Sequence, residues 1–179
     1  GYVFGEMKVG DALQVQGPLG SFFLHDENEQ PIIFMCGGTG FAPVKSMVEH
    51  AFKVGLKRSM VINRGGKSPD NQYLVEQLEK WQREHDNFKF IPVISDPRPE
   101  DNWHGRTGLV TEAILQDYEN LNDHQIYACG PPMMIEAGRT LFLQRGLPED
   151  RYYSDAFLVA HHAVKKEDAS VSQGVGAHD

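Results

Sequence analysis

The sequence predicts an α/β domain with a doubly wound, parallel, five-stranded sheet, and three observations support this fold class. Short, continuously apolar segments recur along the chain, as expected for parallel strands that are covered on both faces. Each of the first four is followed by apolar residues at helical spacing. Glycine-bearing turns follow two of the strands. Because crossovers between parallel strands are right-handed, this alternation places helices on both faces of one sheet.

The strands are expected at residues 31–36, 59–62, 88–94, 125–129 and, as a short fifth candidate, 151–154. Pro92 is unfavourable in the middle of a sheet, since proline has no N–H to donate to a neighbouring strand. A polar loop rich in Pro, Asp and Gly follows the third strand over residues 95–108.

Four amphipathic helices are expected between and after the strands. The second begins in the acidic stretch 68–70, and Gly146 ends the fourth. Their apolar faces are, in chain order, Val44, Met47, Val48 and Ala51; Leu74, Leu78 and Trp81; Val110, Ala113 and Ile114; and Met134, Ala137 and Leu141.

The two ends of the chain differ from this pattern. Apolar and polar residues alternate over 12–16, a Gly-Pro turn follows, and 21–24 is again extended in character. Isolated hairpins are marginal in water, so residues 1–29 are expected to be the last strands of a β domain that is otherwise missing. Residues 30–157 form the α/β domain, and the polar residues 158–179 are expected to be a disordered tail.

Composition excludes several function classes. The net charge is −8, with a pI near 5.4 and no long basic run, which argues against nucleic acid or an anionic membrane as a partner. No apolar stretch approaches the roughly 18–20 residues that cross a bilayer. Two cysteines and no secretory pattern indicate reducing cytoplasm. No metal site is expected, because the pair His161 and His162, near Asp168, falls in the tail.

The first candidate site is the run Gly37-Gly38-Thr39-Gly40 after the first strand, with Pro43 near the first helical position. A helix start attracts phosphate, and glycines let the backbone approach the phosphate oxygens. A tight turn that merely uses glycine is an equally good explanation of the loop alone. The usual dinucleotide fingerprint is absent, and no carboxylate ends the second strand at 63–65, which disfavours a conventional Rossmann dehydrogenase and also a methyltransferase.

The second candidate site is Cys129-Gly130-Pro131-Pro132-Met133, directly after the fourth strand. Ligands of open α/β sheets bind beyond the carboxyl ends of the strands, where the strand order reverses. The two glycine-bearing turns are therefore expected to flank one crevice. Taken alone, Cys129 is more simply explained as a small buried residue at a strand end.

Together these loops resemble the ferredoxin-NADP reductase superfamily, and within it the reductases of the oxygenase-reductase and CDP-6-deoxyhexose reductase type. The segments that carry the resemblance are 17–22, 36–43, 127–133 and 154–157, and they span most of residues 1–157 in the expected order.

The resemblance implies a role for each matching position. Gly37, Gly38, Thr39 and Gly40 hold the pyrophosphate of a nicotinamide dinucleotide, with Thr39 also close to the nicotinamide. Cys129, Gly130 and Pro131 lie around the nicotinamide, and Met133 lies on the adenosine side. Gly65 and Lys67 stand where relatives show Gly-x-Arg. Asp155 helps to shape the site, and Phe157 packs near the flavin.

The same resemblance bears on the choice of cofactor. Relatives that use NADPH end the third strand in Ser followed by Arg, and the arginine meets the 2′-phosphate. Ser95 and Asp96 stand at those positions here, so NADH is expected and NADPH is less favoured. Arg64, Lys67 and Arg98 are the cations that could offset this preference.

The resemblance also implies FAD in the complete protein, held by a preceding β-barrel with an Arg-x-Tyr-Ser/Thr motif. This sequence is expected to contain no such motif, and no four-cysteine iron–sulfur pattern is present. We therefore expect the NAD(P)H-binding domain of a flavoprotein reductase that works with a flavin domain, a 2Fe–2S domain or protein, and an electron-accepting oxygenase or dehydrase. The alternative is a redox-sensing module that binds nucleotide without turnover.

Overall fold

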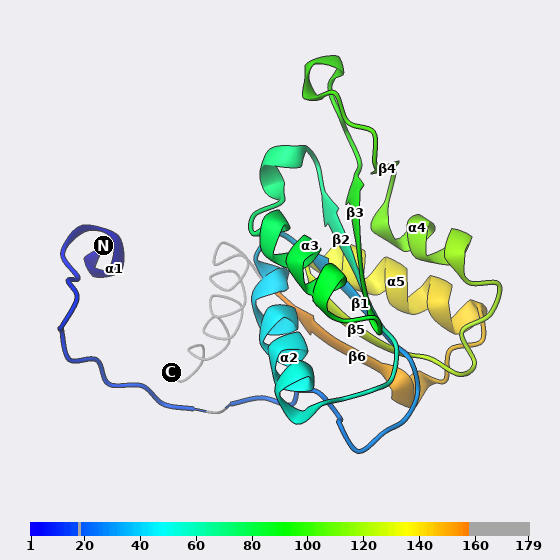
Figure 1. The fold of residues 1–179 in the computed structure, drawn as a ribbon, viewed down its shortest axis with the longest axis horizontal. Coiled ribbons are helices and arrows are strands. Elements are labelled where there is room, and N and C mark those ends of the chain that lie inside the picture. The colour runs from blue at the N-terminus through cyan, green and yellow to red at the C-terminus, as the bar shows by residue number, and fades with distance from the viewer. Residues whose placement is uncertain (18, 158–179) are drawn as a thin grey trace, which may run out of the picture.

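One six-stranded parallel sheet forms the centre of the domain in the computed structural model, which describes residues 1–17 and 19–157 (Figure 1). The strand order is β4-β3-β2-β1-β5-β6. The strands are β1 (Ile32–Gly37), β2 (Met60–Gly66), β3 (Phe88–Ile94), β4 (Arg106–Thr107), β5 (Gln125–Gly130) and β6 (Tyr152–Ala156). Every residue of β1 and β5 is buried, which explains why β1 reads as a continuous apolar run and why β5 is apolar after Gln125.

Helices cover both faces of the sheet, as predicted. Helices α2 (Phe41–Val54) and α3 (Val75–Glu84) pack on the face that carries Phe34, while α4 (Val110–Asp117) and α5 (Pro132–Gln144) pack on the face that carries Ile33. Neighbouring residues of β1 point to opposite faces, so this strand contributes to two separate apolar clusters. The α/β prediction is confirmed.

The sheet has one strand more than expected. The extra strand, β4, has two residues and pairs only with Val93 and Ile94. Its polar sequence within the 95–108 loop gave no strand signal. Pro92 lies one residue before this pairing, where β3 has only β2 as a neighbour, and the missing N–H therefore removes no hydrogen bond to β4.

Two predicted helix faces are corrected. Leu74 is not on the buried face of α3: it precedes the helix, with φ 59°, and is 47% exposed. On α5 the buried residues are Ile135, Gly138 and Phe142, one position further along than the predicted face of Met134, Ala137 and Leu141. A Cβ at Gly138 would lie 2.7 Å from the methyl group of Met35, so the helix packs on the sheet through its glycine.

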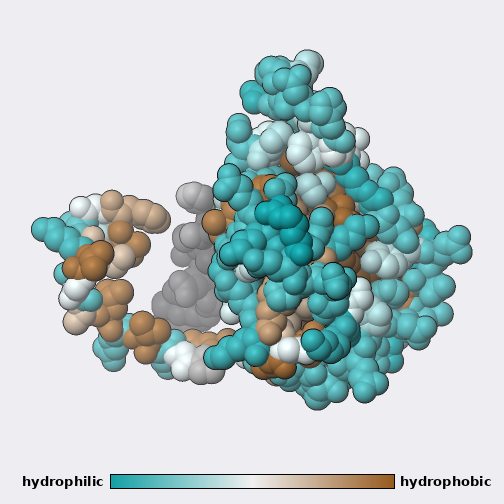
Figure 2. Space-filling model, in the orientation of Figure 1, coloured by the Kyte–Doolittle hydropathy of each residue, from teal (hydrophilic) through white to brown (hydrophobic). Residues whose placement is uncertain are grey.

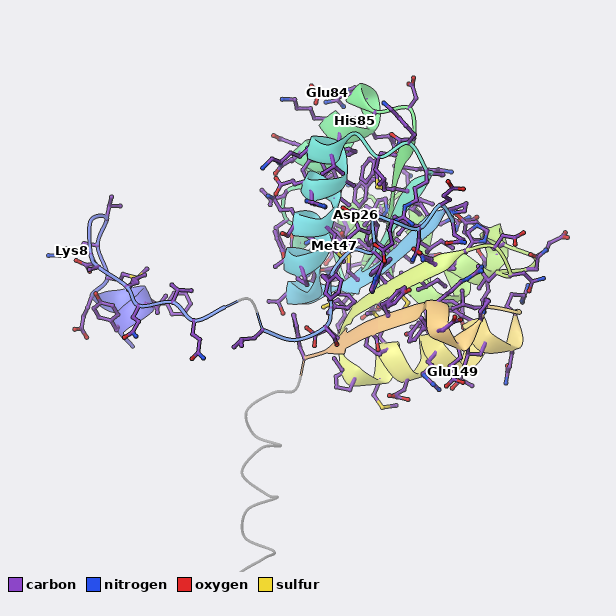
Figure 3. All side chains as sticks on the ribbon, turned by 90° about the horizontal axis from the view of Figure 1, so that it is seen from below. Lys8, Asp26, Met47, Glu84, His85 and Glu149 are labelled. Atoms are coloured by element: carbon purple, nitrogen blue, oxygen red, sulfur yellow. The ribbon has the colours of Figure 1, made fainter. Side chains whose placement is uncertain are left out.

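Residues ahead of β1 contain no strand in the described part of the chain. The strands expected over 12–16 and 21–24 are therefore wrong for this structure, and an unexpected short helix, α1 (Tyr2–Gly5), lies near the start. Figures 1 and 3 show this segment leaving the domain as an arm, with Lys8 well apart from Asp26 and Met47. An extended segment forms a strand only when another strand offers hydrogen bonds, and residues 12–16 meet none.

The arm carries large apolar side chains that nothing in the described chain covers, visible as brown atoms in Figure 2. Phe4, Val9 and Val15 are almost wholly exposed. The assignment of residues 1–29 to a flavin barrel stays a prediction, and the predicted disordered tail, 158–179, lies outside the described residues.

A substitution at Phe142 tests how α5 packs on the sheet. This side chain is fully buried, so Phe142→Ala leaves a cavity and is expected to lower the free energy of unfolding by about 3–5 kcal/mol. Val54→Ala, at an exposed position near the end of α2, is the control and should change it by less than about 1 kcal/mol. Chemical denaturation monitored by circular dichroism measures both, and equal effects would contradict this packing.

Candidate functional site

The main cleft lies at the carboxyl ends of the strands, where the chain changes direction across the sheet. From β1 the chain moves outward through β2 and β3 to β4, and then returns to the other side of β1 as β5. This reversal is where open α/β sheets bind ligands. The cleft has a volume of about 920 Å³. Its lining is Gly37, Gly38, Thr39, Gly65, Gly66, Lys67, Asp70, Asn71, Tyr73, Ser95, Gly108, Leu109, Val110, Thr111, Pro131, Met133, Met134 and Ala137.

The two glycine-bearing loops touch each other beside this cleft. A Cβ at Gly40 would lie 2.1 Å from the carbonyl oxygen of Cys129, and one at Gly130 would lie 3.0 Å from that of Gly37. Gly38 has φ +55° and faces open space. The first loop has two interpretations, a phosphate-binding loop or a tight turn that merely uses glycine, and each interpretation fits a different residue. Gly40 is needed for packing, whereas Gly38 leaves room in the cleft for a ligand.

Two helices begin at the cleft. Gly108 and Leu109 precede α4, Pro131 precedes α5, and all three line the cleft. Helix starts carry unpaired N–H groups and a partial positive charge, which together favour a bound phosphate. Lys67 and Asp70 are the charged residues of the lining. The cleft therefore combines a largely apolar wall with groups that suit a phosphate-bearing ligand.

Several predicted site residues meet in the cleft and others do not. Those that line it are Gly37, Gly38, Thr39, Gly65, Lys67, Ser95, Pro131 and Met133. Those that do not are Gly40, Pro43, Asp96, Cys129, Gly130, Asp155 and Phe157. Pro43 instead lines a smaller groove between residues 22–24 and α2. The roles assigned to all of these residues stay predictions.

The residues predicted around the nicotinamide gather at the end of β5. Asp155 is the register partner of Cys129, and the N–H of Phe157 donates to the carbonyl oxygen of Gly130 at 3.0 Å. Cys129 is fully buried, and Cys36 lies opposite it on β1. Burial raises the pKa of both thiols to about 12, so both stay protonated at neutral pH.

The expectation that the sequence contains no Arg-x-Tyr-Ser/Thr motif is wrong, because residues 151–154 read Arg-Tyr-Tyr-Ser. The structure places three of them in β6 of the sheet, and Arg151 donates to the carbonyl oxygen of Asn122 at 2.9 Å. This segment therefore belongs to the α/β domain, and its match to the pattern is not evidence for a flavin-binding site.

Sequence reasoning missed the part that Arg64 plays. Its side chain is fully buried and cannot swing toward a phosphate: the guanidinium lies 4.3 Å from the ring centre of Phe41 and 4.1 Å from that of Tyr73. It donates to the backbone carbonyl oxygens of Tyr73 and Asn71. Burial lowers its pKa, and contact with two ring faces compensates part of that cost.

Arg64 thereby fixes the wall of the cleft. It holds residues 71–73 against the end of β2, and the Tyr73 hydroxyl lies 3.5 Å from the carbonyl oxygen of Gly38. Sequence reasoning also missed the contribution of α4, because Gly108 and Leu109 come together with the glycine loop only through the crossover. No local pattern reports such a contact.

Within residues 1–17 and 19–157, no helix is long and apolar enough to cross a membrane. The same residues contain no group of three or more His, Cys, Asp or Glu side chains arranged to hold a metal ion.

The fold and this cleft define the chain as a doubly wound α/β domain whose cleft suits a phosphate-bearing ligand, and comparison with known proteins gives its family. Residues 34–140 match the model of the oxidoreductase NAD-binding domain. The chain belongs to this family, within the ferredoxin-NADP reductase superfamily.

Individual relatives agree with this assignment. The chain is 40% identical over 156 residues to the CDP-6-deoxy-L-threo-D-glycero-4-hexulose-3-dehydrase reductase of Yersinia pestis, covering 87% of this chain and 46% of that protein. It is 34% identical to the phenol hydroxylase P5 protein of Acinetobacter pittii, covering 89% and 45%. The solved structure of the Amycolatopsis cytochrome P450 reductase GcoB matches with a TM-score of 0.76 and 29% identity, covering 87% and 46%. The chain spans about half the length of these relatives.

Arg64→Met tests how the cleft wall is held. The variant leaves two carbonyl oxygens unpaired and is expected to lower the free energy of unfolding by about 1–3 kcal/mol while speeding hydrogen exchange at residues 71–74. Arg58→Met is a matched control, because Arg58 also donates to a backbone carbonyl, that of His25, but away from the cleft. Faster exchange at 71–74 in both variants, or in neither, would contradict the role of Arg64.

The two thiols give a second test. Because the folded-state pKa is raised to about 12 while an unfolded thiol titrates near 8.5, we expect both cysteines to resist alkylation by iodoacetamide at mildly alkaline pH until the chain unfolds. Mass spectrometry of native and denatured samples counts the modified residues. Rapid alkylation of either cysteine in the native sample would contradict its burial.

Proposed function

We propose that this chain is the nicotinamide-dinucleotide-binding part of a flavoprotein reductase that receives hydride from NADH and passes electrons onward. The observation that carries the proposal is the cleft at the strand-order reversal, where Gly38 leaves open space and two helices begin. Its volume suits a ligand of dinucleotide size. Membership of the family supports the same ligand.

Each part of the cleft has a distinct task in this proposal. The backbone of Gly37 and Gly38 and the start of α5 bind the pyrophosphate, while Lys67 supplies a cation. Thr39 and Pro131 orient the nicotinamide. NADH supplies the hydride and FAD accepts it, so no side chain here has to act as acid or base.

The complete system then includes more than this domain. Relatives about twice as long, together with the uncovered apolar side chains of the arm, support a flavin domain that packs beside residues 1–29. Relatives named as reductases of a dehydrase and of a dioxygenase support an oxygenase or dehydrase as the electron acceptor. The 2Fe–2S domain or protein that carries electrons to it in this proposal is implied by the family resemblance alone. A redox-sensing module that binds nucleotide without turnover is the second candidate, and the absence of flavin reduction by the complete protein would favour it.

The first test is binding of NADH to residues 1–179. We expect saturable binding by calorimetry without stoichiometric flavin in the purified protein. Gly38→Val should lower the affinity by at least about tenfold, because a branched side chain at φ +55° is strained and projects where phosphate must approach. Gly55→Val, at a glycine of similar φ that ends α2, is the control for strain alone. No NADH binding by the folded wild type would contradict the proposal.

The second test concerns the choice of cofactor. By the family resemblance, Asp96 stands at the position where NADPH-using relatives carry the arginine that meets the 2′-phosphate, and we expect NADH to bind about tenfold more tightly than NADPH. Asp96→Arg should reduce or reverse this ratio. Equal binding of both dinucleotides by the wild type would contradict the preference, and an unchanged ratio in the variant would show that Asp96 is not its source.

A further inference from the structure

Two charged loops form one side of the cleft's rim. Residues 67–71 follow β2 and residues 95–101 follow β3. They are held together by backbone hydrogen bonds, from Ser95 N–H to the carbonyl oxygen of Gly66 at 2.9 Å and from Asp96 N–H to that of Lys67 at 3.0 Å. Four carboxylates and two cations lie on these loops: Asp70, Asp96, Glu100 and Asp101 against Lys67 and Arg98. The rim is therefore net negative.

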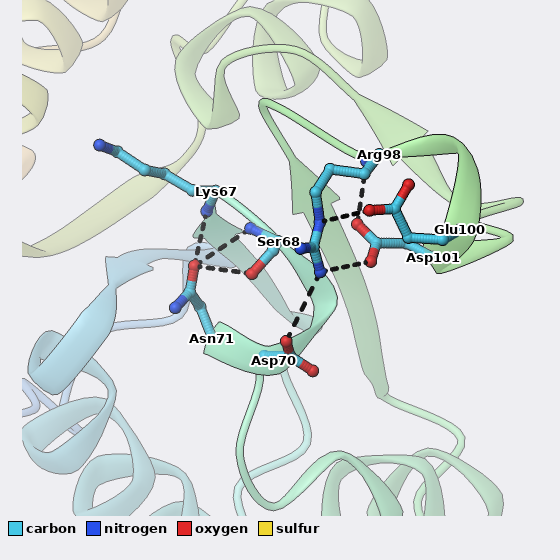
Figure 4. Close-up of polar contacts among 7 residues, drawn as sticks. All are labelled: Lys67, Ser68, Asp70, Asn71, Arg98, Glu100 and Asp101. Carbon is cyan, nitrogen blue, oxygen red and sulfur yellow. Dashed lines mark hydrogen bonds and ion pairs between the residues drawn. The ribbon is translucent and has the colours of Figure 1, made fainter.

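Arg98 is surrounded by carboxylates from both loops (Figure 4). Its Nη2 lies 3.0 Å from an oxygen of Asp101 and 4.0 Å from one of Asp70, and its Nε lies 3.7 Å from Glu100. The Arg98 backbone N–H also donates to Asp101 at 2.9 Å. This hydrogen bond and the guanidinium lower the pKa of Asp101, so the carboxylate stays ionised at neutral pH.

Arg98, held by these carboxylates, is not among the residues that line the cleft. Asp70 does line the cleft, and its carboxylate also lies 4.0 Å from the Arg98 guanidinium. Lys67 lines the cleft too, but its ammonium points away from Arg98 in Figure 4. An arginine fork is the group best suited to a phosphate, and here it is already occupied by carboxylates.

We propose that Asp70 and Asp101 add to the cofactor preference expected from Asp96: they hold Arg98 within the rim, so that a dinucleotide with a free 2′-hydroxyl is favoured over one with a 2′-phosphate. The inference rests on the proposed function. The dianionic phosphate meets a net negative rim, and the Arg98 guanidinium, which could pair with it, is already engaged by Asp70 and Asp101. Both aspartates act through Arg98, and they are positioning residues.

The experiment is a set of variants in which the affinities for NADH and NADPH are compared by fluorescence titration. Asp70→Asn with Asp101→Asn removes two carboxylates that hold Arg98 and should shift the affinity ratio toward NADPH by about tenfold. Adding Arg98→Gln to this double variant should abolish most of the shift. Arg98→Gln alone should change the ratio less than about twofold, because the guanidinium is engaged in the wild type.

A matched control separates this mechanism from net charge. Glu84→Gln with Glu149→Gln also removes two exposed, ion-paired carboxylates, but both lie outside the cleft lining (Figure 3). This pair should leave the ratio unchanged. The shift caused by the aspartate variants should also weaken as salt concentration rises.

Three outcomes would overturn the inference: no shift in the aspartate double variant, a shift that persists without Arg98, or an equal shift in the control. If circular dichroism shows that the double variant does not fold, Asp70→Asn alone is the test, because this side chain is 86% exposed and its loss should not disturb the fold. This single variant should shift the affinity ratio toward NADPH by about threefold, and no shift would count against the inference. NADH binding with an unchanged ratio refutes only the role of Arg98. Failure of the wild type to bind either dinucleotide refutes the proposed function as well.

Discussion

The close contact between the β1–α2 loop and the end of β5 is the constraint on which the rest of the structure depends. Gly40 lies directly against the carbonyl of Cys129, and Gly130 lies against Gly37. Any side chain at Gly40 would force these loops apart, because its Cβ would overlap backbone atoms that cannot rotate away. This contact brings the start of α5 to the same cleft as Gly38.

The opposite wall depends on a buried charge. A guanidinium in the interior is costly unless its donors are paired, and Arg64 gains two backbone carbonyls and two aromatic faces in exchange. The result is a cation that positions Tyr73 beside the glycine loop without itself facing a ligand. Arg98 is engaged in a different way, by carboxylates at the surface. Lys67 therefore remains as the cation in the described lining of the cleft.

Local patterns were sufficient for every strand of the sheet except the two-residue edge strand β4. Parallel strands such as β1 and β5 are buried on both faces, so burial itself produces the apolar run that predicts them. The face of α2 was also correct, since its buried residues follow one periodic stripe. The face of α5 was not, because apolar residues fill two adjacent stripes and Gly138, which makes the contact, gives no hydrophobic signal.

The sequence by itself determined the fold class, the two glycine-bearing loops and their place at strand ends, because these features follow from periodicity and from the conformational freedom of glycine. Only the tertiary structure decided that Gly40 serves packing, that Arg64 is buried, and that the start of α4 completes the cleft. It also showed that residues 12–16 meet no partner strand. These outcomes depend on contacts between residues far apart in the chain, and such contacts leave no pattern in the local sequence.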